Sequence, residues 1–480
     1  MQNSQTDIAF LCSNPNVMVA LVNSAQPYWA PVDRYDNTRF GELWKPLILL
    51  AADDHIRNLM DALAGLSTSE INTSLACGLR VDDDHRKIEI IIASDSDVLQ
   101  ATQDHIQRVW KEMVGISAFS WPASGKGDPR ISQKSKALVR SLYEFCMSTF
   151  SKKFLKNISC LHDWLAKYHE WHEVRASLPR ASWRLRMDEL RSMVEIIEGI
   201  LKDLSAYEND VAISFTSTDT TALDKFISTM DGVMERATSL LAINPGYSNV
   251  PSDWNPLISL GGIVNPLYIG CLRHCLEDLI LFPQNIAKLR EFYLSRHFAH
   301  VVNYALEVIP LNRGSYGAPI GRFPSGPHVW KDVYKHVLLE KGYKPIENQG
   351  SYDFSRIPTD PNELIVHPEL KIATYLHIVS HIFVENSGFS TPPFNYISTS
   401  GLPCLPCAKW MSKLNSLDQG HGVEFRGTSY ECPSNWRMPA MYAEKFSQDM
   451  KIWGCHEYLR VQKAVGRQSL IWIDEIVLKY

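Results

Sequence analysis

The sequence predicts a mainly α-helical N-terminal region followed by a C-terminal domain of alternating helices and strands. Apolar residues recur at three- and four-residue spacing over most of 44–309, which is the period of an amphipathic helix. After a stretch rich in Gly, Pro and Ser at 312–327 (NRGSYGAPIGRFPSGP), the pattern changes to short units. We therefore expect a helical region over 1–320 and an α/β layered domain over 328–480.

In the N-terminal region, four segments carry the helical period most clearly: 138–165, 183–204, 222–241 and 267–306. Two short segments rich in β-branched residues, 87–93 (KIEIIIA) and 210–216 (DVAISFT), predict strands instead. These strands either form a minor sheet or are buried edges. A Gly/Pro/Ser-rich stretch at 121–129 indicates a subdivision of the helical region.

In the C-terminal domain, turn signals and apolar spacing predict an alternating series. We expect helices over 329–340, 368–383 and 404–414 and from 440 onward, and strands over 363–366, 394–399 and 423–427. The strand at 394–399 would lead into the helix at 404–414 as a β-to-α crossover does.

Composition and charge exclude several classes of protein. The chain has 480 residues, more than one hydrophobic core usually organises, and its 45% apolar and 21% charged residues are typical of a folded protein. A net charge of −5 and a pI near 6.4 provide no global attraction for a polyanion, so nucleic-acid binding would need a local basic patch. The lysine-rich stretch 134–156 is a candidate for such a patch. A solvent-exposed helix face is the simpler interpretation of its lysines.

The ten cysteines are spread thinly along the chain, which favours a reducing compartment. The N-terminus lacks the pattern of a secretory signal peptide. The longest apolar stretch, 266–282, contains charged residues that a bilayer centre would penalise, so we expect no membrane span. We expect an intracellular protein, cytoplasmic or nuclear.

Two short motifs carry chemistry. His367-Pro368-Glu369 is followed, 37 residues after the histidine, by Pro403-Cys404-Leu405-Pro406-Cys407. One imidazole and two thiolates provide three zinc ligands and leave the fourth tetrahedral position for water, as a catalytic zinc site requires. Glu369 lies two residues beyond His367, where it can shuttle a proton between that water and a leaving amine.

The prolines support this interpretation. Pro368 and Pro403 both suit the first turn of a helix, where a missing backbone N–H costs nothing. The ligands would then lie at helix N-termini, where the positive end of the helix dipole favours thiolate over thiol.

H-x-E followed by P-C-x-x-C is the signature of zinc-dependent deaminases, and the C-terminal part of the chain resembles the cytidine deaminase-like superfamily. More narrowly, it resembles a fungal branch whose members carry a long helical N-terminal region. The resemblance rests on HPELK at 367–371, STSGLPCLPC at 398–407 and FRGTSYECPSNWRMP at 425–439. It implies a three-layer α/β/α sandwich and one Zn²⁺ per chain, held by His367, Cys404 and Cys407, with Glu369 as the proton shuttle.

The motifs predict hydrolytic deamination of a nucleobase of the cytosine or adenine type, in a nucleoside, nucleotide or nucleic acid. Candidate contacts to the base are Tyr396, Trp410, His421, Arg426 and Trp436, each of which is also compatible with ordinary packing or surface. The alternative is a catalytically inactive, structural-zinc protein that acts as a protein-interaction module. In either case the helical region is a candidate site for a protein partner, and the chain can form a homo-oligomer.

Overall fold

The structure of the protein is a computed structural model. It describes residues 11, 14–25, 51–69, 74–120, 129–175, 184–208, 220–241, 271–312, 316–318, 320, 324, 327–340, 360–386, 393–401, 403–417, 422–425, 433 and 435–454. The predicted strand at 210–216 and the expected subdivision at 121–129 lie outside these residues, apart from Pro129.

The chain forms two compact units that are discontinuous in sequence. Unit 1 comprises residues 1–29, 74–98 and 308–480, and unit 2 comprises residues 30–73 and 99–307. Residues 74–98, expected within the N-terminal helical region, therefore belong with the C-terminal segment. In sequence, most of the helical unit lies between two parts of unit 1.

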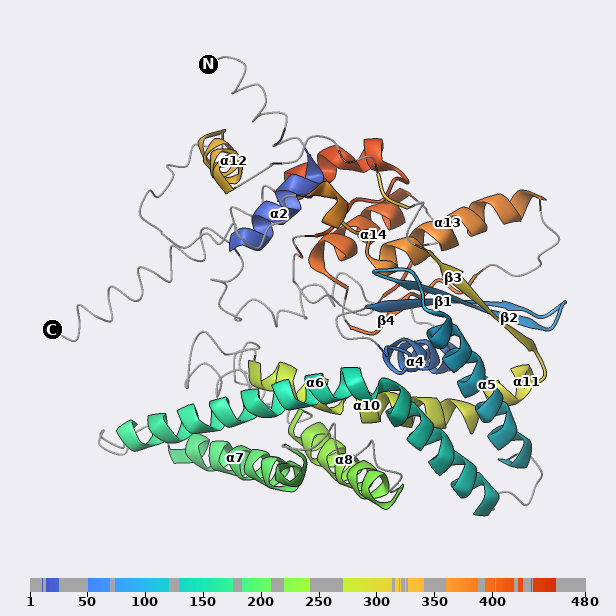
Figure 1. The fold of residues 1–480 in the computed structure, drawn as a ribbon, viewed down its shortest axis with the longest axis vertical. Helices are drawn as coiled ribbons and strands as arrows, with labels where there is room; N and C mark the ends of the chain where they lie inside the picture. The colour runs from blue at the N-terminus through green and yellow to red at the C-terminus, as the bar shows by residue number, and fades with distance from the viewer. Residues whose placement is uncertain are drawn as a thin grey trace. The chain divides into compact units, whose positions relative to one another are not determined.

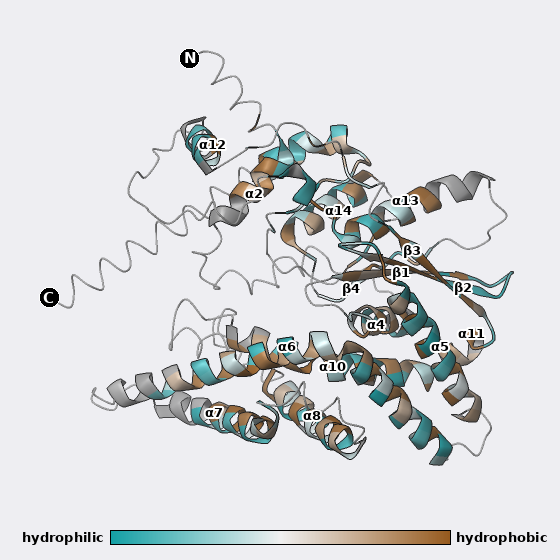
Figure 2. Ribbon diagram, in the orientation of Figure 1, coloured by the Kyte–Doolittle hydropathy of each residue, from teal (hydrophilic) through white to brown (hydrophobic). Residues whose placement is uncertain are grey.

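Unit 2 is helical, as the apolar spacing predicts. Its elements are α4 (Ala51–Gly65), α5 (Gln100–Ser120), α6 (Pro129–Arg175), α7 (Arg184–Leu204), η3 (Ser205–Tyr207), α8 (Thr220–Leu241), α10 (Cys271–Tyr293) and α11 (Arg296–Val301). Helix α10 packs against α4, α6 and α8, and α7 packs against both α6 and α8. Brown and teal alternate along α7 and α8 in Figure 2, as they do in helices with one apolar face.

The expected helix over 267–306 is shorter than predicted. Helix α10 ends at Tyr293, and Ser295 begins α11 by accepting a hydrogen bond from the backbone N–H of Phe298 at 3.3 Å. The chain then enters strand β3 (Ala305–Leu311), which was not predicted.

A four-stranded sheet of order β3-β2-β1-β4 is the centre of unit 1. Strand β1 (Leu75–Asp82) pairs antiparallel with β2 (Lys87–Ser94), which confirms the strand predicted at 87–93. On its other side β1 pairs antiparallel with β4 (Ser398–Thr399), the end of the strand predicted at 394–399. The sheet therefore joins segments more than 300 residues apart.

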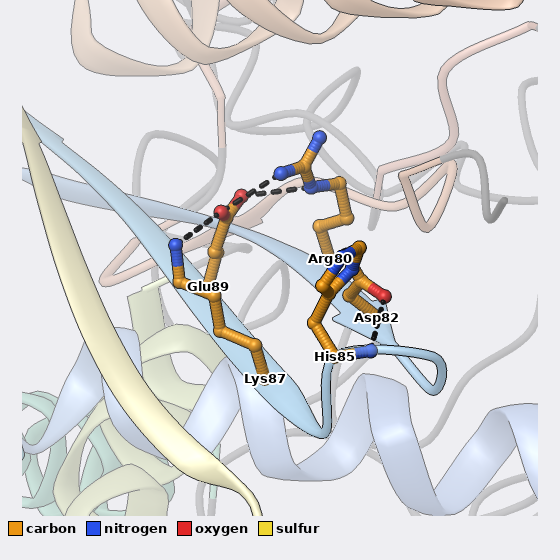
Figure 3. A network of polar contacts seen from close by, with 5 residues as sticks. All are labelled: Arg80, Asp82, His85, Lys87 and Glu89. Atoms are coloured by element: carbon orange, nitrogen blue, oxygen red, sulfur yellow. Dashed lines mark hydrogen bonds and ion pairs between the residues drawn. The ribbon is translucent and has the colours of Figure 1, made fainter. Parts of the chain in front are cut away.

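The β1–β2 hairpin carries a buried ion pair between its two strands. Arg80 is opposite Glu89 in the register, and its Nε lies 2.7 Å from the Glu89 carboxylate, which Lys87 also approaches at 3.1 Å (Figure 3). At the turn, Asp82 accepts a hydrogen bond from the backbone N–H of His85 at 3.0 Å. Arg86 adopts a left-handed φ of 49° to complete the turn.

Helix α13 (Pro368–Asn386) packs against β1 and β2. Gly78 makes room for this packing, because a Cβ at this position would lie 3.0 Å from the Cγ2 of Ile372. Helix α14 (Leu405–Leu417) contacts α13, and α2 (Pro15–Ala25), buried over much of its length, contributes Val19 to the same core cluster. The core is thus assembled from the two ends of the chain and the hairpin between them.

The remaining elements of unit 1 match the predictions unevenly. Helix α12 (Pro327–Glu340) confirms the expected helix at 329–340, and residues 443–454 form the expected later helix. The strand predicted at 363–366 is wrong, because η7 (Pro361–Glu363) occupies its start and only Ile365 forms a bridge, to Trp436. The strand predicted at 423–427 is reduced, among its described residues, to a parallel bridge of Glu424 with Tyr396.

The predicted fold class is therefore confirmed only at a coarse level. Among the described residues the chain is mainly helical with one four-stranded sheet. The three-layer sandwich remains a proposal.

Candidate metal centre

The first motif lies at the N-terminus of α13. The carbonyl oxygen of His367 accepts hydrogen bonds from the backbone N–H groups of Leu370 at 3.0 Å and Lys371 at 3.2 Å, so His367 caps the helix. Pro368 is the first helical residue, as predicted. This arrangement places the Glu369 side chain in the first turn, beside the imidazole of the capping residue.

The second motif lies at the N-terminus of α14. Its first helical residue is Leu405, and the Cys404 carbonyl accepts a hydrogen bond from the backbone N–H of Ala408 at 3.0 Å. Cys404 is therefore the capping residue and Cys407 lies in the first turn. Pro403 precedes the cap instead of occupying the first turn, which corrects the predicted role of this proline.

The two helix N-termini bring four side chains together. The ligand atoms of His367, Glu369, Cys404 and Cys407 all lie within 4.8 Å of one another. His367 Nδ1 is 3.4 Å from the Cys404 sulfur and 3.9 Å from the Glu369 carboxylate, so Nδ1 is the imidazole atom directed into the cluster. This group can hold a metal ion.

The cluster is buried. Glu369 is 4% exposed, Cys404 is 7% exposed and Cys407 is completely buried. Placing a carboxylate, an imidazole and two thiols together inside a protein costs free energy unless their charges are matched. A cation bound among these four groups would supply that match, so the residues present fit a metal ion.

The groups of the cluster shift one another's protonation. Burial would lower the pKa of His367, but the Cys404 sulfur and the Glu369 carboxylate outweigh burial and raise that pKa well above its ordinary value. Burial would raise the pKa of Glu369, but the neighbouring His367 holds that pKa below its ordinary value.

The two thiols shift in opposite directions. Against the effect of burial, hydrogen bonding from Cys407 and the positive charge of His367 lower the pKa of Cys404 to about 7. Burial and the adjacent Cys404 sulfur raise the pKa of Cys407 well above its ordinary value. Without a metal, Cys404 is therefore the sulfur that ionises first and Cys407 is the one that keeps its proton.

Of the five residues predicted to contact a base, three are buried and two lie outside the described part of the chain. Tyr396 is 3% exposed, and Trp410 and Trp436 are completely buried. Trp436 lies beside the cluster, where its indole Nε1 donates a hydrogen bond to the Cys407 sulfur at 3.3 Å. His421 and Arg426 lie outside the described residues.

Lys371 is a buried polar residue near the motif to which the sequence analysis assigned no role. It is 1% exposed, and its Nζ donates to the backbone carbonyl of Ser94 at 2.6 Å. The sequence HPELK includes this lysine, but nothing in that pattern indicates that its side chain is buried.

The basic stripe at 134–156 is a solvated face of α6. Lys134, Lys136, Lys152, Lys153 and Lys156 are exposed. Among the aromatic residues between them, Tyr143, Phe150 and Phe154 are buried, and the half-buried Phe145 stacks on His105. No stacking platform of described aromatic residues therefore accompanies these lysines on α6.

Comparisons with known proteins add no assignment, because no family model, curated protein or solved structure matches the chain. Within the described part of the chain, no helix is both long enough and apolar enough to cross a membrane.

Proposed function

We propose that the protein is a zinc-dependent hydrolase that removes the exocyclic amine of a nucleobase of the cytosine or adenine type. The observation that carries this proposal is the convergence of His367, Glu369, Cys404 and Cys407 within 4.8 Å at two helix N-termini. The two motifs are separated by 37 residues, counted from His367 to Cys404, so their convergence at one buried point supports a shared role in binding a metal. This is the residue set that the H-x-E and P-C-x-x-C signature assigns to such enzymes.

Zinc suits the donor set best among common metals. Two thiolates and one imidazole are soft and borderline ligands that favour zinc over magnesium or calcium, which prefer oxygen. When bound, zinc supplies a water of strongly lowered pKa. Three ligands from His367, Cys404 and Cys407 leave a position for that water, whereas a closed structural site would use a fourth protein ligand.

Glu369 has the properties of a proton carrier. Its carboxylate is 3.9 Å from His367 Nδ1, and it lies in the cluster that would hold the zinc and its water. Its burial keeps bulk water from competing for the proton. In the proposed reaction Glu369 takes one proton from the attacking water and gives it to the ring nitrogen. It then takes the second proton from the same oxygen and gives it to the amine, which leaves as ammonia while the ring carbon becomes a carbonyl.

The fold is compatible with the sandwich that the resemblance implies. Helix α13 packs against β1 and β2, and β4 precedes α14 as the predicted crossover requires. Trp436 is buried and its indole contacts the Cys407 sulfur, so we assign it to support of the site. His421 and Arg426 remain our candidates for direct contact with the base.

Metal content is the first test of the proposal. We expect one zinc per purified chain, measured by elemental analysis, and loss of that zinc in Cys407→Ser. Cys146→Ser is a matched control, because Cys146 is an equally buried thiol outside the cluster. Folded wild-type protein that binds no zinc would contradict the proposal.

Ammonia release tests the reaction. We expect release from a cytosine- or adenine-containing nucleoside, nucleotide or oligonucleotide, lowered by about 100-fold or more in Glu369→Gln, with zinc content unchanged. Glu444→Gln provides the same chemical change at an exposed glutamate outside the cluster and should keep full activity. A zinc-loaded wild type that is inactive on the whole panel would favour the inactive, structural-zinc alternative.

A further inference from the structure

Trp436 connects the two halves of the metal cluster. Its backbone forms a parallel bridge with Ile365, two residues before His367. Its side chain reaches the other half, where indole Nε1 is 3.3 Å from the sulfur of Cys407. One residue from the C-terminal part of unit 1 therefore contacts the segments that carry both motifs.

The position of this indole is firmly fixed. The backbone N–H of Ile365 donates to the carbonyl of Asn435 at 2.7 Å, and that of Arg437 donates to the carbonyl of Ile365 at 2.7 Å. The Arg437 guanidinium also donates twice to the carbonyl of Ala318, at 3.1 and 2.7 Å. Trp436 itself is completely buried and belongs to the core cluster, so packing also holds the ring beside the sulfur.

The hydrogen-bonding role of the Cys407 sulfur changes when a metal is bound. A thiol can both donate and accept a hydrogen bond, but a thiolate that ligates a metal can only accept. An N–H group directed at such a sulfur draws electron density away from the metal–sulfur bond. It also fixes the orientation of the ligand, as partners of metal ligands generally do.

We propose that Trp436 is a positioning residue of the metal centre, and that its indole N–H hydrogen bond tunes the Cys407 thiolate as a metal ligand. The inference rests on the proposed metal site, but it is independent of which base is the substrate. It assigns Trp436 a defined function in place of the contact with a base that the sequence suggested. Two effects follow: tighter metal retention through a preorganised ligand, and weaker electron donation from that sulfur to the metal.

Trp410 offers a matched control within the same core. It is also a completely buried tryptophan of the cluster of apolar residues around the site, and it lies on α14 only three residues after Cys407. Its indole nitrogen, in contrast, has no hydrogen-bond partner among the described residues. Replacing either tryptophan with Phe removes similar volume, but only one replacement removes an N–H···S hydrogen bond.

The experiment compares cobalt-substituted wild type, Trp436→Phe and Trp410→Phe. Co²⁺ can replace zinc, and its absorption spectrum contains a band from charge transfer out of the thiolate ligands. We expect this band to move to lower energy in Trp436→Phe alone, because a sulfur without the N–H donor releases its electron more easily. We also expect about 10- to 100-fold weaker zinc binding in Trp436→Phe, and little change in Trp410→Phe, by competition with a chelator.

The outcomes separate this inference from the proposed function. If wild type binds neither zinc nor cobalt, the metal site itself is wrong. If the wild type binds metal but Trp436→Phe has the same band position and zinc affinity as Trp410→Phe, only the role of Trp436 is overturned. If Trp436→Phe does not fold, 3-benzothienylalanine at position 436 keeps the size of tryptophan without the N–H. An unshifted cobalt band in that protein overturns the inference, and a shifted band supports it.

Discussion

The Nζ of Lys371 donates a hydrogen bond of 2.6 Å to the backbone carbonyl of Ser94, which lies 277 positions earlier in the chain. Lys371 is in the second turn of the helix that carries Glu369, and Ser94 is the last residue of β2. Both residues are buried. This hydrogen bond ties the start of α13, where His367 and Glu369 lie, to the end of β2.

Lys371→Met should destabilise unit 1. The methionine keeps the length of the apolar stem but leaves the buried Ser94 carbonyl without this donor, which costs about 1–3 kcal/mol. Chemical unfolding of the purified protein measures the difference. Lys413→Met serves as the control, because Lys413 and Asp449 form an exposed pair whose loss should cost less than about 1 kcal/mol. Equal effects of the two substitutions would argue against a special role for Lys371.

The buried pair of Arg80 and Glu89 should behave as a unit. Glu89→Met removes the carboxylate that pairs with the buried Arg80, and we expect it to lower the free energy of unfolding by about 3–5 kcal/mol. Arg80→Met should cost less, because Lys87 remains beside the Glu89 carboxylate at 3.1 Å. The double substitution removes both charges and should cost less than the sum of the two. A double-mutant cycle from urea unfolding gives the coupling energy, and strictly additive effects would contradict this prediction.

His105 should make unit 2 less stable in acid. The residue is fully buried, its ring stacks on Phe145 with centroids 3.6 Å apart, and its Nε2 is 3.0 Å from the carbonyl oxygen of Leu66. Burial lowers its pKa from 6.5 to about 4. The unfolded chain therefore binds a proton that the folded protein excludes, and stability falls as the pH drops from 6.5 towards 4.

The size of this effect follows from the shift. A difference of about two and a half pKa units corresponds to about 3 kcal/mol at the acidic end. His105→Gln keeps an N–H donor near the Leu66 carbonyl but has no titratable ring. Between pH 7 and 4.5 this variant should therefore lose less stability than the wild type, and the difference should be a large part of the ~3 kcal/mol. The same loss of stability in His105→Gln as in the wild type would contradict this prediction.

Zinc binding should weaken as the pH falls. The pKa of Cys407 and that of His367 are both raised in the cluster without metal, so these groups hold protons at neutral pH that a metal must displace. We expect the zinc dissociation constant to rise by about tenfold or more for each pH unit between 8 and 6. Chelator competition over that range measures the slope, and an affinity independent of pH would show that the ligands are already deprotonated.

The candidate site was predictable from the sequence because its residues stand in two short motifs. Each motif contains its own helix start, so local chemistry indicated both the ligand types and the helix ends. The Trp436 contact was not predictable as such. No spacing rule links a tryptophan to a cysteine 29 residues earlier, and it is the isolated bridge between Trp436 and Ile365 that brings the indole to the sulfur.

The helices of unit 2 were predictable for a similar reason, because apolar spacing is a local signal. Strand β1 was missed, since LACGLRVD contains a glycine and lacks regular alternation. Its place is set by tertiary partners instead: Gly78 lets Ile372 approach, and Cys77 pairs with Ser398. The discontinuous composition of unit 1 follows from these distant pairings, which no local pattern in the sequence reports.

The antiparallel pairing of Cys77 with Ser398 also has a consequence for biosynthesis. The two residues are separated by 321 positions, and most of the helical unit, residues 99–307, is encoded between them. At about 5–20 residues per second, the ribosome needs about 15–60 s to deliver the second partner after the first. During that interval the β1–β2 hairpin has an open edge. A nascent chain is therefore most exposed to chaperones, and to mispairing with other chains, while unit 2 is being synthesised.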